Sequence, residues 1–397
     1  GNFERSELIR YIGSAPNWST VVPRSDGVIS SSAQIADDIS GSFISGVGYT
    51  GNVQTGIATA DGTWSAGGAM SQAKAYGMGV GDKSAALAVG GAPAVWPAPA
   101  VGNADVGRTE QYDGTSWSEA PDNVTARNFG AASGTANDAL IIGGFLPPTW
   151  YGVSTGATET YDGTSFSEVN DLNQARRATT GAGTSTNSSL AYGGYQDSAP
   201  VNPGFSPIMQ RMTEEWNGTN WSEVNDLPAN VRRGNGGGTV NAAIWYGGRG
   251  SVGCTFHYNG TNWATGGSGH RNECNVDGGG AQNDAISAGS SYNTYTATTQ
   301  IYDGSTWSSA NDRINAIGDG AVGVNQGKAS TAIIFGGDGP TYVPYAAKTC
   351  TEEWNGGAGG TFSAGLVSAD NLKGDATAFI GGTSGIYNAD NTSAWQT

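Results

Sequence analysis

The sequence predicts an all-β protein, a β-propeller of repeated four-stranded units, and two recurring features carry this prediction. The first is a hairpin pattern that returns at intervals of about 50 residues, with near copies at 109–119, 158–168, 213–223 and 299–308. The second is an apolar run that ends in two glycines and precedes each hairpin. Repeats of this length, made of short strands and tight turns, are typical of sheets packed radially around an axis.

Each hairpin pattern predicts the two outer strands of a unit, which we call strands c and d. An alternating run ends at Asp-Gly or Asn-Gly, as at Asp113–Gly114, and the next run opens with an aromatic residue such as Trp117. Asp-Gly and Asn-Gly tolerate positive φ at both central positions of a type I′ turn, which matches the twist of the flanking strands. We therefore expect type I′ hairpins.

The apolar runs predict strand b of each unit. Glycine pairs at strand ends let neighbouring backbones approach closely near a crowded axis. Eight anchors of this kind occur, the last two in weaker form: Gly90–Gly91, Gly143–Gly144, Gly193–Gly194, Gly247–Gly248, Gly336–Gly337, Gly381–Gly382, Gly46–Gly48 and Gly289.

A weaker strand a, often opened by arginine, lies between each hairpin and the next glycine anchor. A glutamate in strand c recurs together with this arginine, and we expect many of them to form charge-assisted hydrogen bonds within or between blades. A buried charge without its partner is costly, so a structural role explains the recurrence. The residues assigned to this role are Glu110, Arg127, Glu159, Arg176, Glu214 and Arg232.

The pattern resembles the kelch family and the related central propeller of galactose oxidase, in which a double glycine is followed by a spaced tyrosine and a tryptophan. The resemblance covers the chain from about Ser25 onward. Its matches are Gly143–Gly144 with Tyr161 and Phe166, Gly193–Gly194 with Trp216 and Trp221, Gly247–Gly248 with Tyr258 and Trp263, and Gly336–Gly337 with Trp354 and Phe362. The run at 213–227, TEEWNGTNWSEVNDL, is also similar to kelch-type repeats encoded by marine bacteriophages.

Counting the anchors and the hairpins gives eight kelch-like blades, with seven as the alternative because the terminal copies are degenerate. We expect residues 1–20 to form an N-terminal arm, in which Trp18–Ser19 adds a closing strand to the last blade. Residues 21–397 then form the propeller. Closure of this kind would remove the open edges of a linear β array.

Composition excludes several classes of partner. The net charge is −16 with only 18 basic residues, so no basic patch favours nucleic acid. No apolar run reaches the ~18 residues of a membrane span, and no signal peptide is visible. Cys254 and Cys274 fall in one blade and could pair, although small buried side chains are the simpler interpretation.

Catalytic and metal-binding constellations are not found in the sequence. A copper centre like that of galactose oxidase needs two histidines and a tyrosine linked to a cysteine, but His257 and His270 lack such companions. Sialidases need an arginine triad with a tyrosine–glutamate pair, whereas the arginines here recur once per repeat. We therefore predict no catalytic residue, no metal and no cofactor.

The connections between strands b and c vary strongly in length, which marks the face they share with the d–a connections as a candidate binding face. They hold prolines and the aromatic residues expected to contact a ligand or partner: Trp96, Trp150, Tyr151, Tyr195, Phe205, Tyr342 and Tyr345. Such aromatics suit sugar stacking or a protein interface. The alternative is local packing over their own blades.

These observations predict a non-enzymatic binding or structural module outside the cell. The phage resemblance makes a virion component the leading version, such as a fibre, decoration or adsorption protein. Its expected partners are other virion proteins or a host cell-surface glycan, without nucleic acid or membrane insertion. The alternative is a secreted carbohydrate-active enzyme of galactose oxidase or sialidase type, which predicts a metal or carboxylates that converge at the axis.

Overall fold

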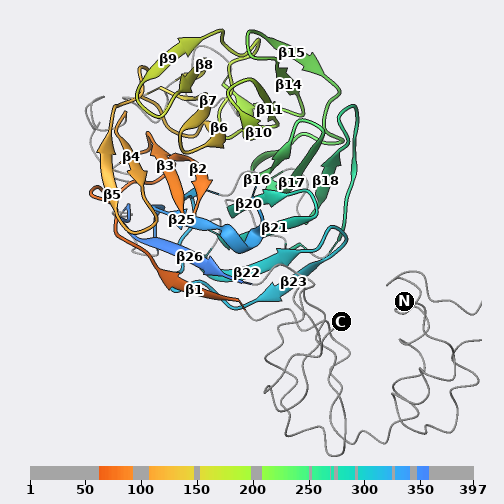
Figure 1. Ribbon diagram of the computed structural model, residues 1–397. Helices are drawn as coiled ribbons and strands as arrows, with labels where there is room; N and C mark the ends of the chain where they lie inside the picture. The colour runs from red at the N-terminus through yellow and green to blue at the C-terminus, as the bar shows by residue number, and fades with distance from the viewer. Residues whose placement is uncertain are drawn as a thin grey trace, which may run out of the picture. The chain divides into compact units, whose positions relative to one another are not determined.

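A computed structural model describes residues 62–92, 107–146, 153–197, 208–249, 253–268, 270–271, 276–290, 294–323, 327–339 and 347–356. These residues form six four-stranded antiparallel sheets arranged around one axis as the blades of a β-propeller (Figure 1). The number of blades is therefore six, and the predictions of eight and of seven were wrong. The anchors at Gly46–Gly48 and Gly381–Gly382 lie outside the described residues, as do Trp18, Ser19 and Phe362.

Each blade runs from strand a beside the axis to strand d at the rim. The strand bounds are as follows. Blade 1 has β2 (Met78–Asp82), β3 (Ala85–Val89), β4 (Thr109–Tyr112) and β5 (Trp117–Ala120); blade 2 has β6 (Ala131–Thr135), β7 (Asp138–Phe145), β8 (Ser154–Tyr161) and β9 (Phe166–Val169); blade 3 has β10 (Thr180–Ser185), β11 (Ser188–Tyr192), β14 (Thr213–Trp216) and β15 (Trp221–Val224).

The other three blades follow the same order, and one short hairpin and one 3-10 helix stand beside them. Blade 4 has β16 (Arg232–Thr239), β17 (Ala242–Arg249), β18 (Thr255–Tyr258) and β19 (Trp263–Thr265); blade 5 has β20 (Asp277–Ala281), β21 (Asp284–Ser290), β22 (Thr296–Tyr302) and β23 (Trp307–Ala310); blade 6 has β24 (Ala321–Gly323), β25 (Ile333–Phe335), β26 (Thr351–Asn355) and β1 (Thr63–Ala66). The hairpin is β12 (Tyr195–Gln196) with β13 (Ile208–Met209), and η2 spans Ala329–Thr331.

Blade 6 closes the ring with strands from two distant parts of the chain. Strand β1 supplies its rim strand and pairs antiparallel with β26, so that Trp64 faces Trp354. The closing strand was expected at Trp18–Ser19, which lie outside the described residues; in the described ring, the strand that pairs with β26 contains Trp64–Ser65. Since the ring is complete between Thr63 and Asn355, the terminal repeat copies are not needed for it, which explains the overcount.

The hairpins between strands c and d do not contain the expected type I′ turns. In the turn after Tyr112, only Gly114 has positive φ, at 91°, while Asp113 does not. The Asp113 Oδ1 atom instead accepts hydrogen bonds of 2.8 Å from the backbone N–H groups of Thr115 and Ser116. The loop is therefore a longer Asx turn in which the side chain satisfies the backbone.

The glycine pairs at or near the end of strand b link four of the blades to the next one. The N–H of Gly144 in blade 2 donates to the carbonyl oxygen of Arg176 in blade 3, at 3.0 Å. Equivalent bonds join Gly91 to Arg127, Gly194 to Val231 and Gly337 to Lys74. At Gly143 a Cβ atom would lie 2.7 Å from the Arg176 oxygen, and φ is 58°. Close approach and positive φ together require glycine here.

Two of the expected arginine–glutamate ion pairs are present and fully buried. Arg127 pairs with Glu159, and Arg176 pairs with Glu214, within blades 2 and 3. Glu159 also accepts hydrogen bonds from the N–H groups of Val124 and Thr125, at 2.7 and 3.0 Å. The carboxylate therefore ties the d–a connection to strand c of the same blade.

Glu110 has the same role with a different cation. Its Oε1 atom lies 3.5 Å from the Nζ atom of Lys74 in blade 1. In blade 6, Glu352 lies 3.5 Å from Arg313, whose Nη1 atom also lies 2.7 Å from Asp277 of blade 5. Four blades thus place a buried cation next to the strand c glutamate.

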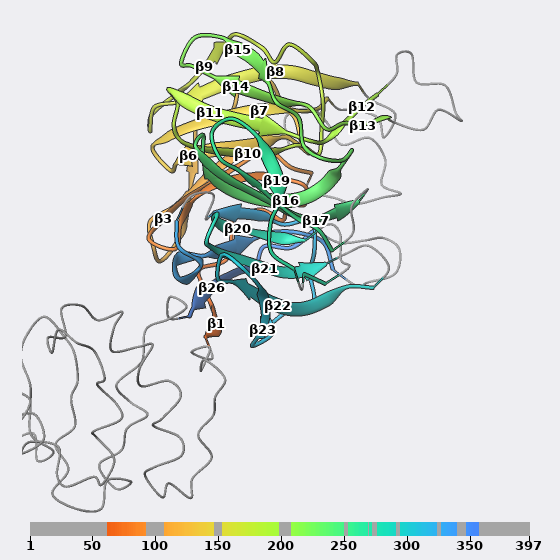
Figure 2. The ribbon, with the colours of Figure 1, turned by 90° about the vertical axis from the view of Figure 1, so that its right-hand side faces the viewer.

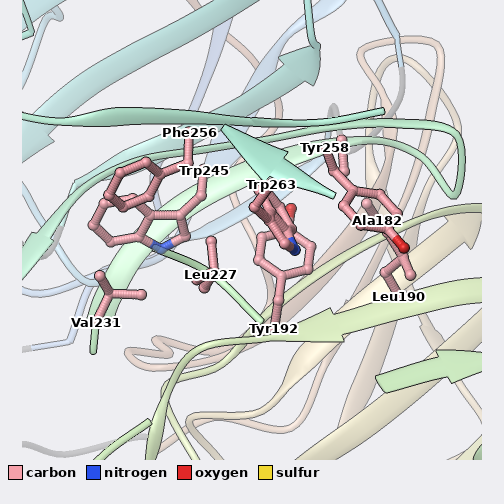
Figure 3. Close-up of a cluster of buried hydrophobic side chains, with 10 residues drawn as sticks. Ala182, Leu190, Tyr192, Leu227, Val231, Trp245, Phe256, Tyr258 and Trp263 are labelled. Carbon is pink, nitrogen blue, oxygen red and sulfur yellow. The ribbon is translucent and has the colours of Figure 1, made fainter. Parts of the chain in front are cut away.

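Blade 4 replaces this ion pair with two apolar side chains. Val231 stands where blades 2 and 3 have Arg127 and Arg176, and Phe256 stands where they have the glutamate. Both are buried in the cluster that contains Trp245 (Figure 3). Arg232 is one residue further along the chain, and its guanidinium lies over the ring of Tyr195, 4.8 Å from the centroid. The structural role expected for Arg232 is thus not that of a glutamate partner.

The rim tryptophans form a belt of hydrogen bonds between blades. The Trp263 Nε1 atom of blade 4 donates to Thr213 Oγ1 at the start of strand c in blade 3, at 2.9 Å. Trp64, Trp117, Trp221 and Trp307 do the same toward Thr299, Thr351, Thr158 and Thr255. Blade 2 has Phe166 at this position, and Thr109 Oγ1 of blade 1 is buried without a hydrogen bond to any described residue.

Replacing Phe166 with tryptophan is therefore expected to stabilise the protein, because the indole N–H would reach the unsatisfied Thr109 hydroxyl. The gain should be about 0.5–1.5 kcal/mol, the net contribution of one hydrogen bond. Urea unfolding of the F166W variant measures it. The same substitution in a Thr109→Val background should lose most of the gain; an equal gain in both backgrounds would show that packing alone is responsible.

The free cysteines of the described residues include Cys254, which packs against the core cluster of blade 4. Cys274 lies outside the described residues. Cys254 is a free thiol that is partly buried, so the interpretation as a fully buried hydrophobic side chain was wrong in that respect.

Candidate functional site

The start of strand a and the end of strand b meet on one face of the ring. Single bridges join Ala75 to Ala92, Asn128 to Phe145, Arg177 to Tyr195 and Gly318 to Asp338. The b–c connections therefore begin on the face where strand a begins, as the sequence predicted. The β12–β13 hairpin of blade 3 extends from this face (Figure 2). We call it the b–c face.

Of the loop aromatics expected on this face, the structure describes Tyr195. The others lie outside the described residues: Trp96, Trp150, Tyr151, Phe205, Tyr342 and Tyr345. Tyr195 is 5% exposed, so a ligand would meet the side chains that cover its ring more readily than the ring itself.

A ring of left-handed residues surrounds the axis at this face. Each stands at or just before the start of strand a of its blade, and φ lies between 49° and 61°; they are Tyr76, Phe129, Ala178, Arg233 and Asp319. Backbone hydrogen bonds connect them, for example from Phe129 N to the Tyr76 oxygen at 2.9 Å and from Ala178 N to the Phe129 oxygen at 2.7 Å. Left-handed backbone at residues other than glycine is sparsely populated and often marks functional positions.

Inside this ring, a cavity of about 130 Å³ lies on the axis. Strand a residues and the residues before them line it from all six blades, and many are glycine, alanine or threonine. At a share of ~30 Å³ per water molecule, the space would hold about four waters. The cavity can therefore accept a small polar group, and its mouth opens within the ring of left-handed residues.

Aromatic and charged side chains meet at this axial mouth. The rings of Tyr76 and Phe129 stack at a centroid distance of 4.2 Å, and the Arg233 guanidinium lies 5.0 Å from the Phe129 centroid. Asp338 Oδ2 accepts hydrogen bonds from the hydroxyls of Tyr295 and Tyr76, at 2.9 and 3.3 Å. These contacts hold the mouth residues in place.

The carboxyl group of Asp338 has a perturbed pKa. Burial, together with the negative charges of Asp319 and Asp277, raises this pKa to about 7, against the hydrogen bonds from the two tyrosines, which lower it. Its Oδ1 atom is buried without a hydrogen bond to a described residue. Asp338 is thus a titratable group near the axis at neutral pH.

On the side of blades 3 and 4, a group of arginines gathers around Tyr195. The Arg177 guanidinium lies 4.6 Å from the Tyr195 centroid and 4.1 Å from that of Phe145. Arg232 lies 4.8 Å from the Tyr195 centroid. We call Arg177, Arg232, Arg233 and Tyr195 the arginine cluster.

Burial lowers the pKa of Arg232, and three neighbouring arginines oppose its charge as well: Arg177, Arg233 and Arg249. One ion pair within the described residues offsets this charge directly, between Arg177 Nη2 and Asp197 Oδ1 at 2.8 Å. Asp319 also acts electrostatically on Arg233. The arginine cluster therefore concentrates positive charge on the b–c face of an acidic protein.

The sequence contains a signal for this cluster that the predicted structural role of the arginines does not include. The arginines occur as consecutive pairs, Arg176–Arg177 and Arg232–Arg233. The first arginine of the blade 3 pair points into the blade toward Glu214, while the second contacts Tyr195. Neighbouring residues of an extended chain point to opposite sides. The two arginines of a pair therefore cannot both contact the strand c glutamate.

The two histidines have protein partners. His257 Nε2 lies 3.0 Å from the Tyr302 hydroxyl, and His270 Nε2 lies 3.0 Å from the Ser287 hydroxyl. Burial lowers the pKa of His270 to about 4. Within the described residues, no group of three or more His, Cys, Asp and Glu side chains is arranged to hold a metal ion.

Comparison with known proteins supports the architecture. No protein-family model matches the sequence, and no curated protein is similar to it. Among solved structures, one titled "Structure of YjhT" superposes with a TM-score of 0.56 at 10% identity, over 71% of this chain and 95% of that one. At such low identity the likeness extends to the propeller fold alone. In the described part of the chain, no helix is long and apolar enough to cross a membrane.

Proposed function

We propose that this protein is a non-enzymatic binding and structural module that works outside the cell as a component of a virus particle. The observation that carries the binding role is the b–c face, where a closed, rigid ring presents an axial mouth beside the arginine cluster. Sites held on rigid scaffolds lose little conformational entropy on binding. The kelch-type pattern and the phage-like spelling of the repeats support the assignment to a virion.

The b–c face would contact a host cell-surface glycan or another virion protein. Arginine and aromatic groups are enriched at binding surfaces of both kinds. The connections predicted to carry the loop aromatics begin on this face, since they follow strand b. Their distribution suits a recognition surface that differs from blade to blade.

A second candidate function is a secreted enzyme that acts on carbohydrates. One observation favours it: the charges of Asp319 and Asp277 act on Asp338, whose pKa is raised to about 7 by burial and by these two charges. Paired carboxyl groups serve glycoside chemistry when one stays protonated. However, Asp277 is already bound to Arg313 and to the N–H of Gly320 at 2.8 Å.

Mass spectrometry of purified virus particles, beside the cellular and secreted fractions, tests the proposal. We expect this chain to be enriched together with the major capsid protein. Recovery in the secreted fraction alone, together with turnover of a sugar oxidase or sialidase substrate that Asp338→Asn abolishes, would overturn the proposal and establish the enzyme.

A further inference from the structure

We propose that the arginine cluster binds the carboxylate of an acidic glycan, with Arg232 and Arg177 as its principal ligands. This inference rests on the proposed function, because it names the ligand class of the same face. The cluster comprises side chains from two blades, and the ring of Tyr195 between them keeps two guanidinium groups at fixed places.

The charge balance of the cluster calls for an anion. The chain has 18 basic residues and a net charge of −16, yet the charges of Arg177, Arg233 and Arg249 all oppose that of Arg232 here. Arg177 has Asp197 as its partner, but Arg232 makes no ion pair with a described residue. Like charges in proximity destabilise a fold unless a counter-charge joins them.

Unused hydrogen-bond donors point the same way. The Nε atoms of Arg177 and Arg232 are both buried without a hydrogen bond to a described residue. A buried donor without a partner is costly, and native structures keep few of them without a reason. A carboxylate oxygen would satisfy these donors, and the planar guanidinium fork matches carboxylate geometry.

The shape of the site favours a glycan over an acidic protein surface. The cluster borders an axial mouth whose cavity of about 130 Å³ accepts a small group, whereas a stable protein interface needs roughly 800 Å² from each partner. Arg233 belongs both to the cluster and to the lining of this cavity. A single sugar residue can place its carboxylate at the arginines while its hydroxyls enter the mouth.

Binding of the full chain to defined polymers tests the inference by calorimetry at low and high salt. Polygalacturonate is the acidic probe and a neutral galactan is its uncharged counterpart. We expect the acidic polymer alone to bind, with an affinity that falls as salt rises. Arg232→Gln should weaken binding about tenfold or more, the effect of losing a hydrogen bond to a charged group, and Arg177→Gln should do likewise.

Arg211→Gln is the matched control. This arginine is 60% exposed and already pairs with Asp226, and its guanidinium is not among those that lie over the Tyr195 ring, so its loss should leave affinity unchanged. Melting temperatures of all variants show whether they remain folded, and Arg232, which is only half-buried, is the decisive position.

The following outcomes would overturn the inference. Equal binding of the neutral galactan would show that charge is not recognised, and an undiminished affinity of R232Q would show that the cluster is not the site. Binding of a sulfated galactan alone would make the anion a sulfate, and binding of poly-L-glutamate alone would make the partner an acidic protein. If no polymer binds but the chain is found in virus particles, this inference fails and the proposed function stands; absence from particles bears on the proposed function alone.

Discussion

Glu159→Ala is expected to destabilise the protein by about 3–5 kcal/mol, the cost of leaving a buried charge without its partner. The substitution removes the partner of Arg127, whose side chain is fully buried. It also removes the acceptor for the N–H groups of Val124 and Thr125. Urea unfolding measures the loss; a cost below about 1 kcal/mol, as for exposed pairs, would contradict the structural role.

A double substitution separates the cost of an unpaired buried charge from the cost of the cavity left by a smaller side chain. Blade 4 shows that Val231 and Phe256 can occupy the equivalent positions, where both are buried. We therefore expect Arg127→Val combined with Glu159→Phe to be more stable than Glu159→Ala alone, since replacing both charges by apolar groups can be nearly neutral. A double variant as unstable as the single one would show that blade 2 cannot repack.

Trp64→Ala is expected to open the ring at blade 6 and to cost about 3–5 kcal/mol, as truncations of large buried aromatics do. Trp64 is 8% exposed, packs against Trp354 with tilted rings whose centroids lie 5.3 Å apart, and donates to Thr299 Oγ1 at 3.0 Å. Because no hairpin joins β1 to β26, the loss of this side chain should free β1 from the blade. Hydrogen exchange should then increase along β26.

Trp263→Ala is the control for this effect. Trp263 is equally buried and donates to Thr213 Oγ1 at 2.9 Å. Its strand β19 is joined to β18 by a tight hairpin, so it should remain paired although stability falls by a similar amount. If hydrogen exchange increased equally, in β26 for Trp64→Ala and in β18 for Trp263→Ala, the missing hairpin between β1 and β26 would have no effect on local stability.

The repeat pattern predicted the blades but not their number. Anchors such as Gly143–Gly144 mark the place near the end of strand b where close contact with the next blade excludes any side chain. The predicted number of blades was wrong for two reasons. A degenerate repeat copy cannot be told in the sequence from a copy that forms a blade, and β1 belongs to the same blade as β26. Which strand closes the ring depends on pairing between residues nearly 300 positions apart.

Local chemistry was predicted in part. The pairing of Arg127 with Glu159 followed from their joint recurrence, whereas the turn at Asp113–Gly114 was assigned to the wrong type. Asp113 gains two hydrogen bonds in a longer Asx turn, and this gain outweighs the twist preference of a two-residue turn. The sequence could not show which of two consecutive arginines faces the axis.

The sequence by itself determined the all-β class, the four-stranded unit, the glycine contacts between blades and the buried ion pairs. Each of these depends on residues that lie within one repeat or recur in the next. Only the tertiary structure decided that six blades close the ring, that β1 completes the last blade, and that Arg177, Arg232 and Arg233 meet around Tyr195. These features depend on the curvature of the ring, which brings together side chains from different blades and which no single repeat encodes.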